Sequence, residues 1–173
     1  MANKIEIDSS TVQPLAGIIK GYSQYWQDIT NPWPVTENEF RNTVPPLDDL
    51  YLAKKITYNF LDSNVVTDKN DLQSITQIME QFRRDQGSSA VTNCCVYPIM
   101  SQMGWHTNSN YPGIRRYYTF SLGKTIFAYK HHGNIVYQED QPGWTCREFE
   151  VGEDLYWHSI WTEKFRFSFG LRF

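Results

Sequence analysis

The sequence predicts an α+β protein in which a helical N-terminal portion packs on one sheet of a small jelly roll. Apolar residues follow helical spacing up to about residue 88, and strand-like runs separated by turn residues continue from there to the C-terminus. An aromatic content of 16% favours a β-rich second half. We therefore expect a single domain over residues 1–173, with a mostly helical portion at 1–88 and a jelly-roll core at 89–173.

The beginning of the chain combines a short strand, a helix and a loop. Residues 4–7 are typical of a strand, and residues 11–26 place apolar side chains on one helical stripe with Pro14 in the first turn. Residues 31–40 contain two prolines, which disfavour any regular element. We expect a turn-rich loop there.

Two further helical patterns complete the N-terminal portion. Residues 47–61 repeat apolar side chains at helical spacing. Residues 67–87 form the clearest helix of the chain, with Thr67 and Asn70 as candidate N-terminal caps and Gly87 as the C-terminal stop.

Short strand-like runs fill the second half of the chain. Turn-forming segments such as 108–113 and 131–134 separate them. In chain order, the predicted strands are 91–99, 103–107, 115–122, 125–130, 134–138, 145–150, 154–158 and 164–173. Two packed antiparallel sheets are the natural arrangement for so many short strands.

The composition argues against several classes of partner. A net charge of -3 provides no basic surface for nucleic acid. The polar N-terminus predicts no secretory signal, and no apolar run approaches the ~18 residues that a membrane span needs. Three cysteines are an odd number, so we expect reduced thiols in a cytoplasmic protein, or in the host cytoplasm if the gene belongs to a phage.

Two of the four histidines stand in strand-like runs. His131 and His132 fall in a predicted turn, where we expect exposed side chains. His106 and His158 each follow a tryptophan within a strand-like run. Two half-buried histidines with ordinary hydrogen-bond partners would also fit this pattern, so the histidines alone do not establish a metal site.

The last predicted strand has two chemically different faces. Alternation puts phenylalanine and leucine side chains on one face, which must be core. The other face carries Arg166 and Arg172 and must look into a polar space. Solvent at a sheet edge, or a barrel interior that binds a carboxylate, would satisfy these guanidinium groups.

Taken in order, these residues resemble the 2-oxoglutarate/iron(II) dioxygenases. The shared pattern is a histidine, a residue two positions later, a second histidine and an arginine, at His106, Asn108, His158 and Arg166. The resemblance implies a double-stranded β-helix, a form of jelly roll, with iron(II) held at the first three positions. It also implies a small-molecule cosubstrate, 2-oxoglutarate, bound by Arg166.

Within that superfamily, the spacing in residues 93–173 is similar to that of the AlkB-type nucleic-acid dealkylases. Tyr97 stands nine residues before the first histidine, and Arg166 and Arg172 are six residues apart. A Phe-Ser-Leu-Gly segment at 120–123 follows the first histidine, as in that family. The resemblance implies that Tyr97 and Arg166 bind 2-oxoglutarate, with Arg172 as a further contact.

Two positions depart from the family pattern. Asn108 stands where the family has a carboxylate ligand, and Cys95 stands where the AlkB type has an asparagine. No counterpart of the nucleotide-recognition lid is present, so dealkylation does not follow. Three alternatives remain: Asn108 binds iron weakly through its carbonyl oxygen, another carboxylate replaces it, or the fold is kept without metal. The candidate carboxylates are Glu139, Asp140 and Asp154.

Several aromatic and basic residues have two interpretations. Alternation points Trp105 and Trp157 away from any pocket and into the core, whereas Trp144 is a candidate to cover a pocket mouth. Arg115 and Arg116 are adjacent on a strand, so one faces inward and one outward. The inward one is either a surface charge beside aromatic residues or a contact to substrate or cosubstrate.

We therefore expect a non-haem iron(II), 2-oxoglutarate-dependent oxygenase, a hydroxylase of unknown prime substrate. The alternative is a catalytically silent jelly-roll binding or structural module, for example a viral one, and Asn108 is the feature that favours it. Convergence of His106, His158 and Arg166 in one barrel mouth is what the first hypothesis requires.

Overall fold

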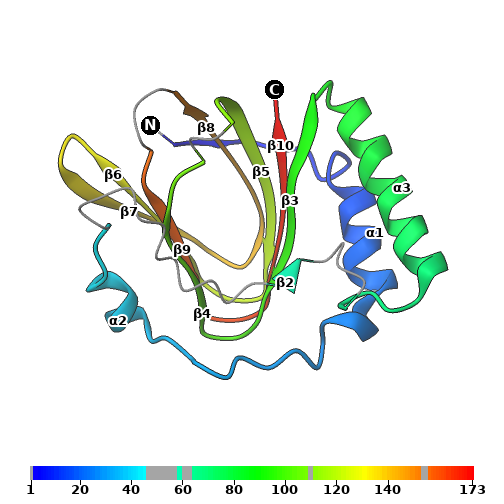
Figure 1. Cartoon of the computed structure of the whole chain (residues 1–173), viewed down its shortest axis with the longest axis horizontal. Coiled ribbons are helices and arrows are strands. Elements are labelled where there is room, and N and C mark those ends of the chain that lie inside the picture. Colours follow the sequence, from blue (N-terminus) through cyan, green and yellow to red (C-terminus); the bar gives the residue numbers. More distant parts are fainter. Residues whose placement is uncertain (1, 46–57, 60–63, 109–110, 153–155) are drawn as a thin grey trace.

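Two antiparallel sheets face each other, and two helices cover the outer face of the larger sheet (Figure 1). The computed structural model describes residues 2–45, 58–59, 64–108, 111–152 and 156–173. Of the helix predicted at 47–61, only Tyr58 and Asn59 are described, and they form a short strand. The rest of that prediction lies outside the described residues.

The larger sheet has six strands and contains the C-terminal strand near its centre. In spatial order they are β1 (Asn3–Ile5), β8 (Gly143–Val151), β5 (Gly113–Ser121), β10 (Arg166–Arg172), β3 (Ala90–Tyr97) and β2 (Tyr58–Asn59). The short strand predicted at 4–7 is confirmed as β1, one residue earlier.

The smaller sheet has four strands. In spatial order they are β4 (Ser101–His106), β9 (His158–Thr162), β6 (Thr125–His131) and β7 (Asn134–Asp140). Seven of the eight predicted strands are confirmed within a few residues. Of the strand predicted at 154–158, residues 154 and 155 lie outside the described residues, and residues 156 and 157 are not in a strand. Strand β9 begins only at His158, where the buried run His158–Thr162 pairs with both β4 and β6.

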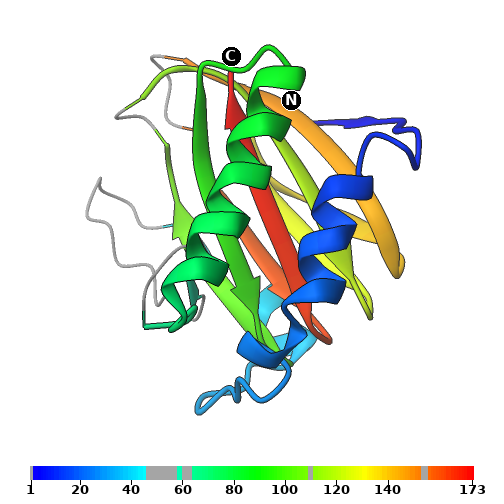
Figure 2. The same cartoon turned by 90° about the vertical axis from the view of Figure 1, so that its right-hand side faces the viewer.

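Two helices pack on the outer face of the larger sheet (Figure 2). Helix α1 (Gln13–Gly21) is followed by the 3-10 turn η1 (Ser23–Tyr25), and helix α3 (Lys69–Asp85) lies beside α1. Both helices were predicted. The N-terminal cap of α3 is Asp68, not Thr67 or Asn70. The Asp68 carboxylate accepts hydrogen bonds from the backbone N–H groups of Asn70 and Asp71.

A third helix corrects the loop prediction for 31–40. Helix α2 (Glu37–Arg41) begins there because Thr36 and Glu39 form a capping box, and the two prolines precede the cap. Phe40 of this helix packs against tryptophans on the outer face of the smaller sheet. None of the described helices is long and apolar enough to cross a bilayer.

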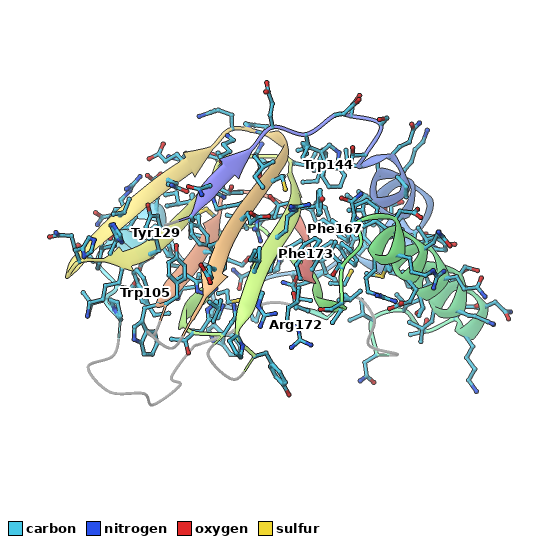
Figure 3. All side chains as sticks on the ribbon, turned by 90° about the horizontal axis from the view of Figure 1, so that it is seen from above. Trp105, Tyr129, Trp144, Phe167, Arg172 and Phe173 are labelled. Atoms are coloured by element: carbon cyan, nitrogen blue, oxygen red, sulfur yellow. The ribbon has the colours of Figure 1, made fainter. Side chains whose placement is uncertain are left out.

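Three tryptophans whose orientation the sequence predicts pack on the outer sides of the sheets. Trp105 and Trp157 pack with α2, so their predicted orientation away from the interior is confirmed. Trp144 packs at an angle against Phe120 and edge-to-face against Phe167, on the helix side of the larger sheet (Figure 3). The prediction that Trp144 covers a pocket mouth is therefore wrong.

The two faces of β10 are as predicted from alternation. Phe167, Phe169 and Leu171 are completely buried beneath the helices. Arg166 and Arg172 point to the opposite side, into the space between the sheets. The apolar face of this central strand thus fixes which way its arginines point.

Candidate functional site

A cavity of about 790 Å³ lies between the two sheets. Residues from seven strands line it: β3, β5, β8 and β10 from the larger sheet, and β4, β6 and β9 from the smaller one. The lining is aromatic and polar, and all of its charged side chains are arginines. The volume is in the range of small-molecule binding sites.

The two strand histidines meet on the wall of this cavity. His106 and His158 are directly opposite on β4 and β9, and their ring centroids are 4.1 Å apart. Nδ1 of His106 lies 2.8 Å from the carbonyl oxygen of Gly104, and Nδ1 of His158 lies 3.0 Å from that of Tyr156. In the neutral rings these contacts favour a proton on Nδ1, which makes Nε2 the nitrogen with a lone pair.

Burial controls the protonation of His158. The ring is 2% exposed, and this burial, followed by the neighbouring His106, holds the pKa of His158 well below its usual value. The imidazole is therefore neutral at neutral pH, which is the form that binds a metal ion.

Asn108 lies beside the histidine pair. Its Nδ2 atom is 3.4 Å from Nε2 of His158 and 3.4 Å from the hydroxyl of Tyr117. The two ends of an amide group are nearly identical in shape, so rotating it by 180° puts Oδ1 toward the imidazole nitrogen. Oδ1 of Asn108 then faces Nε2 of His158, whose ring lies against that of His106.

Two of the candidate replacement carboxylates are engaged elsewhere. Arg147 binds Asp140 with two hydrogen bonds of 2.8 and 3.0 Å, and Lys4 lies 3.1 Å from the same carboxylate. Burial alone would raise the pKa of Asp140, but these cations outweigh it and lower the pKa. Glu139 pairs with Arg41.

Within the part of the chain that the structure describes, no group of three or more histidine, cysteine, aspartate or glutamate side chains is suited to hold a metal. Asp154, the third candidate carboxylate, lies outside that part. Among the described residues, Asn108 is therefore the oxygen donor that the structure brings to the histidine pair.

Arg166 enters the cavity from β10. Its side chain is 6% exposed, and its Cζ atom lies 4.6 Å from the centre of the Tyr97 ring. The Nε and Nη1 atoms are buried and have no hydrogen-bond partner among the described residues. A guanidinium with buried, unpaired N–H groups is costly, and a carboxylate ligand is the group that would satisfy both.

Tyr97 forms the platform beneath this guanidinium. Burial raises the pKa of the Tyr97 hydroxyl, and the nearby positive charge of Arg166 opposes that rise. The hydroxyl stays protonated, 3.9 Å from the sulfur of Met103. Tyr97 and Arg166 are opposite each other on β3 and β10, so the sheet register holds the pair together.

Arg172 stands at the other end of β10. Its Cζ atom lies 5.5 Å from the centre of the Tyr111 ring, and its side chain is half-buried. Six residues of strand correspond to ~20 Å, so Arg166 and Arg172 approach the cavity from opposite ends.

Arg115 is a cavity residue whose role the sequence left undecided. It is the inward member of its pair and is 2% exposed, whereas Arg116 faces outward and bonds to Glu148 at 2.7 Å. Nη2 of Arg115 donates to the carbonyl oxygen of Tyr111, and its buried Nη1 has no partner among the described residues. The interpretation of Arg115 as a surface charge is therefore wrong.

Of the remaining histidines and the cysteines, only Cys95 lines the cavity. His132 is exposed in a turn with a φ of 47°, and His131 is the last residue of β6. All three cysteines are buried thiols, and Cys95 lines the cavity. The turn prediction for His132 is confirmed, while His131 ends a strand.

The cavity therefore combines two kinds of binding group. Two neutral imidazoles and an amide form a compact donor set, and a buried guanidinium with unpaired nitrogens lies further along β10. Such a set fits a divalent metal ion beside a small dicarboxylate. The missing element for a high-affinity site is the negative charge that a carboxylate would add.

Comparison with solved structures finds distant likenesses, among them the following two. No protein-family model and no curated protein matches the chain. A prolyl hydroxylase in complex with a hypoxia-inducible-factor oxygen degradation domain peptide fragment, from Trichoplax adhaerens, superposes with a TM-score of 0.47 at 14% identity. That alignment covers 99% of this chain and 82% of the other.

The second likeness is much weaker. The capsular polysaccharide assembling protein CapF from Staphylococcus aureus aligns with a TM-score of 0.16 at 9% identity, over 57% of this chain and 35% of that one. Neither likeness is strong enough to bear on function. Any functional conclusion must come from the residues of the cavity.

Proposed function

We propose that this protein is a non-haem iron(II), 2-oxoglutarate-dependent oxygenase, and that its facing sheets form a double-stranded β-helix. Arg166 carries the proposal: a buried guanidinium with two unpaired nitrogens lies in the same cavity as a pair of facing histidines. A folded chain that keeps such a costly group has a use for it as an anion-binding site.

Each site residue has a defined task in this proposal. His106, His158 and Asn108 would hold the iron, and Arg166 on its Tyr97 platform would bind the far carboxylate of 2-oxoglutarate. Iron and 2-oxoglutarate, when bound, supply the activation of dioxygen for hydroxylation. The carbonyl groups that contact both Nδ1 atoms orient the imidazoles, and burial keeps His158 neutral.

The sheet register leaves room for the cosubstrate. Tyr117, which contacts Asn108, is paired with Gly170, whereas Arg166 is paired with Ser121. Four residues of strand correspond to ~13 Å, enough for a guanidinium group and a five-carbon dicarboxylate between the two levels. Arg172 lies beyond Gly170 on β10, so it can approach only the end of 2-oxoglutarate that is farther from Arg166.

The alternative is a non-catalytic module with the same fold, and Asn108 favours it. A neutral amide binds a divalent cation more weakly than a carboxylate does, because it contributes no charge. The two functions differ in one property: an oxygenase binds 2-oxoglutarate together with a metal, whereas a binding module has no need of one.

Calorimetric titration of 2-oxoglutarate, with and without manganese(II) as an air-stable substitute for iron(II), tests the proposal. We expect binding that requires the metal and that is lost in both His158→Ala and Arg166→Met. Arg116→Met, which removes an outward arginine of a neighbouring strand, is the matched control and should bind normally. Metal-independent binding, or no binding at all, would contradict the proposal.

A further inference from the structure

The far end of the cavity contains two arginines on neighbouring strands. Arg115 and Arg172 are directly opposite each other in the β5–β10 register, and both line the cavity. Like charges in directly opposed positions destabilise a sheet. The pKa of Arg115 is lowered, mainly by burial and to a lesser extent by the positive charge of Arg172.

Among the described residues, no acidic side chain compensates this charge. All charged residues on the cavity lining are arginines, and of these Arg147 is neutralised by Asp140. Within the described residues, neither Arg115 nor Arg172 forms a salt bridge, and Nη1 of Arg115 is buried without a hydrogen bond. The charges of iron(II) and 2-oxoglutarate would cancel each other, so this end of the cavity would still lack an anion.

Arg115 and Arg166 lie on opposite sides of the histidine pair. Tyr117 marks the level of Asn108, and Arg115 is two residues further along the same face of β5, ~7 Å away. Arg166 is paired with Ser121, four residues from Tyr117 in the other direction. A ligand held by Arg115 is thus separate from one held by Arg166, with the histidines between them.

Aromatic residues neighbour Arg115 in the strand register. Phe149 is paired with Arg115 on β8, and Tyr117 stacks on Phe149 with ring centroids 5.6 Å apart. Phe127 lies 5.8 Å from Phe149 and extends this surface toward His158. The surface suits a flat or apolar body that carries its charge at one end.

We propose that the prime substrate is a small carboxylate with an apolar body, whose carboxylate binds to Arg115. The word substrate rests on the proposed oxygenase function, whereas the anion site itself does not. The apolar body packs along Phe149 and Tyr117, which brings it toward the histidine pair. Arg172 adds a second positive charge on the side of the carboxylate.

The test uses two probes that have the same shape and differ in charge: 3-phenylpropionate and 3-phenylpropionamide. Their binding to the full chain is measured by ligand-observed NMR titration, without metal, in the wild type and in Arg115→Met, Arg166→Met and Arg116→Met. We expect the wild type to bind the carboxylate at least about tenfold more tightly than the amide, the fold-change of one charge-assisted hydrogen bond.

The variants locate the site. Arg115→Met should abolish the preference for the carboxylate, while Arg166→Met and Arg116→Met keep it. Arg115→Lys retains the positive charge and should keep part of the preference, so it serves as the second variant if Arg115→Met folds poorly. Equal binding of the two probes by the wild type, or a preference that survives in Arg115→Met and disappears in Arg166→Met, would overturn the proposal.

Failure of this proposal is distinguishable from failure of the proposed function. If carboxylate binding depends on Arg115 but 2-oxoglutarate does not bind with metal, the anion site is supported and the oxygenase function is refuted. Metal-dependent 2-oxoglutarate binding without any Arg115-dependent preference keeps the oxygenase and refutes the substrate class.

Discussion

Replacing Arg166 by methionine should stabilise the ligand-free protein, which is the opposite of what most core substitutions do. Methionine fills a similar space but has no N–H groups, so it removes the buried, unpaired Nε and Nη1 atoms. In the wild type without a bound anion, these two nitrogens stay buried and unpaired, which costs stability. We therefore expect the charge of Arg166 to serve a ligand rather than the fold.

The magnitude follows from two opposing contributions. An unpaired buried polar group costs about 1–3 kcal/mol, and the contact between Arg166 and Tyr97 stabilises by about 0.5–2 kcal/mol. The free energy of unfolding should rise by about 1 kcal/mol, which corresponds to ~2–4 °C in a protein of this size.

Arg147 supplies the matched control. It is as buried as Arg166, each being 6% exposed, but it forms two hydrogen bonds with Asp140 and one with Gln138. Arg147→Met leaves Asp140 in the interior with only Lys4 nearby, which should cost about 3 kcal/mol. Arg147→Met combined with Asp140→Asn should recover part of that loss.

Urea unfolding at neutral pH, without metal or 2-oxoglutarate, measures all of these variants. In the presence of manganese(II) and 2-oxoglutarate, the wild type should become more stable than Arg166→Met, because the ligand binds and stabilises only the wild type. A ligand-free Arg166→Met protein that is as destabilised as Arg147→Met would refute the reasoning, since the unpaired Nε and Nη1 atoms would then carry no net cost to the fold.

Two other predictions concern the strand register and the buried histidine. Gly170→Ala should destabilise by about 1–3 kcal/mol, because a Cβ there would lie 2.4 Å from Oδ1 of Asn93 and 2.5 Å from Oγ1 of Thr92. Gly17→Ala, whose Cβ meets nothing within 4 Å in helix α1, should instead stabilise, and similar unfolding midpoints for the two variants would speak against the tight packing of β10. For the metal-free protein, the lowered pKa of His158 means that the unfolded state binds more protons below pH 6.5, so stability should fall as pH falls below that value, by up to ~1.4 kcal/mol per pH unit. Urea titrations across this range should show a shallower slope for His158→Asn, and an unchanged slope would mean that another group titrates.

The parts of the fold that follow from local pattern were predictable from the sequence. Alternation along β10 correctly separated a buried phenylalanine face from a face that carries Arg166, because a strand has a strict period of two, but it did not decide between solvent and a barrel interior for the arginines. Helix α3 was predictable from its apolar stripe. Helix α2 was missed although Thr36 and Glu39 carry its capping-box signal, because the preceding prolines dominated the interpretation.

The site was predictable only in part. The sequence paired His106 with His158 through their spacing and a family resemblance, but their direct opposition on β4 and β9 depends on the sheet order. The importance of Arg115 depends on contacts that no local pattern encodes: an unpaired Nη1 and Arg172 across the strand pair. The strand containing His158 was misplaced because β9 is buried on both faces and shows no alternation.

Anaerobic titration with iron(II) and then 2-oxoglutarate tests the central claim most directly. A bound iron–2-oxoglutarate chelate has a weak visible charge-transfer band, and we expect this band in the wild type and a tighter iron(II) titration in Asn108→Asp, which adds the missing negative charge. His106→Ala should abolish it. A band that appears only in Asn108→Asp would contradict the account, since the wild-type cavity would then be an anion site that no longer binds iron.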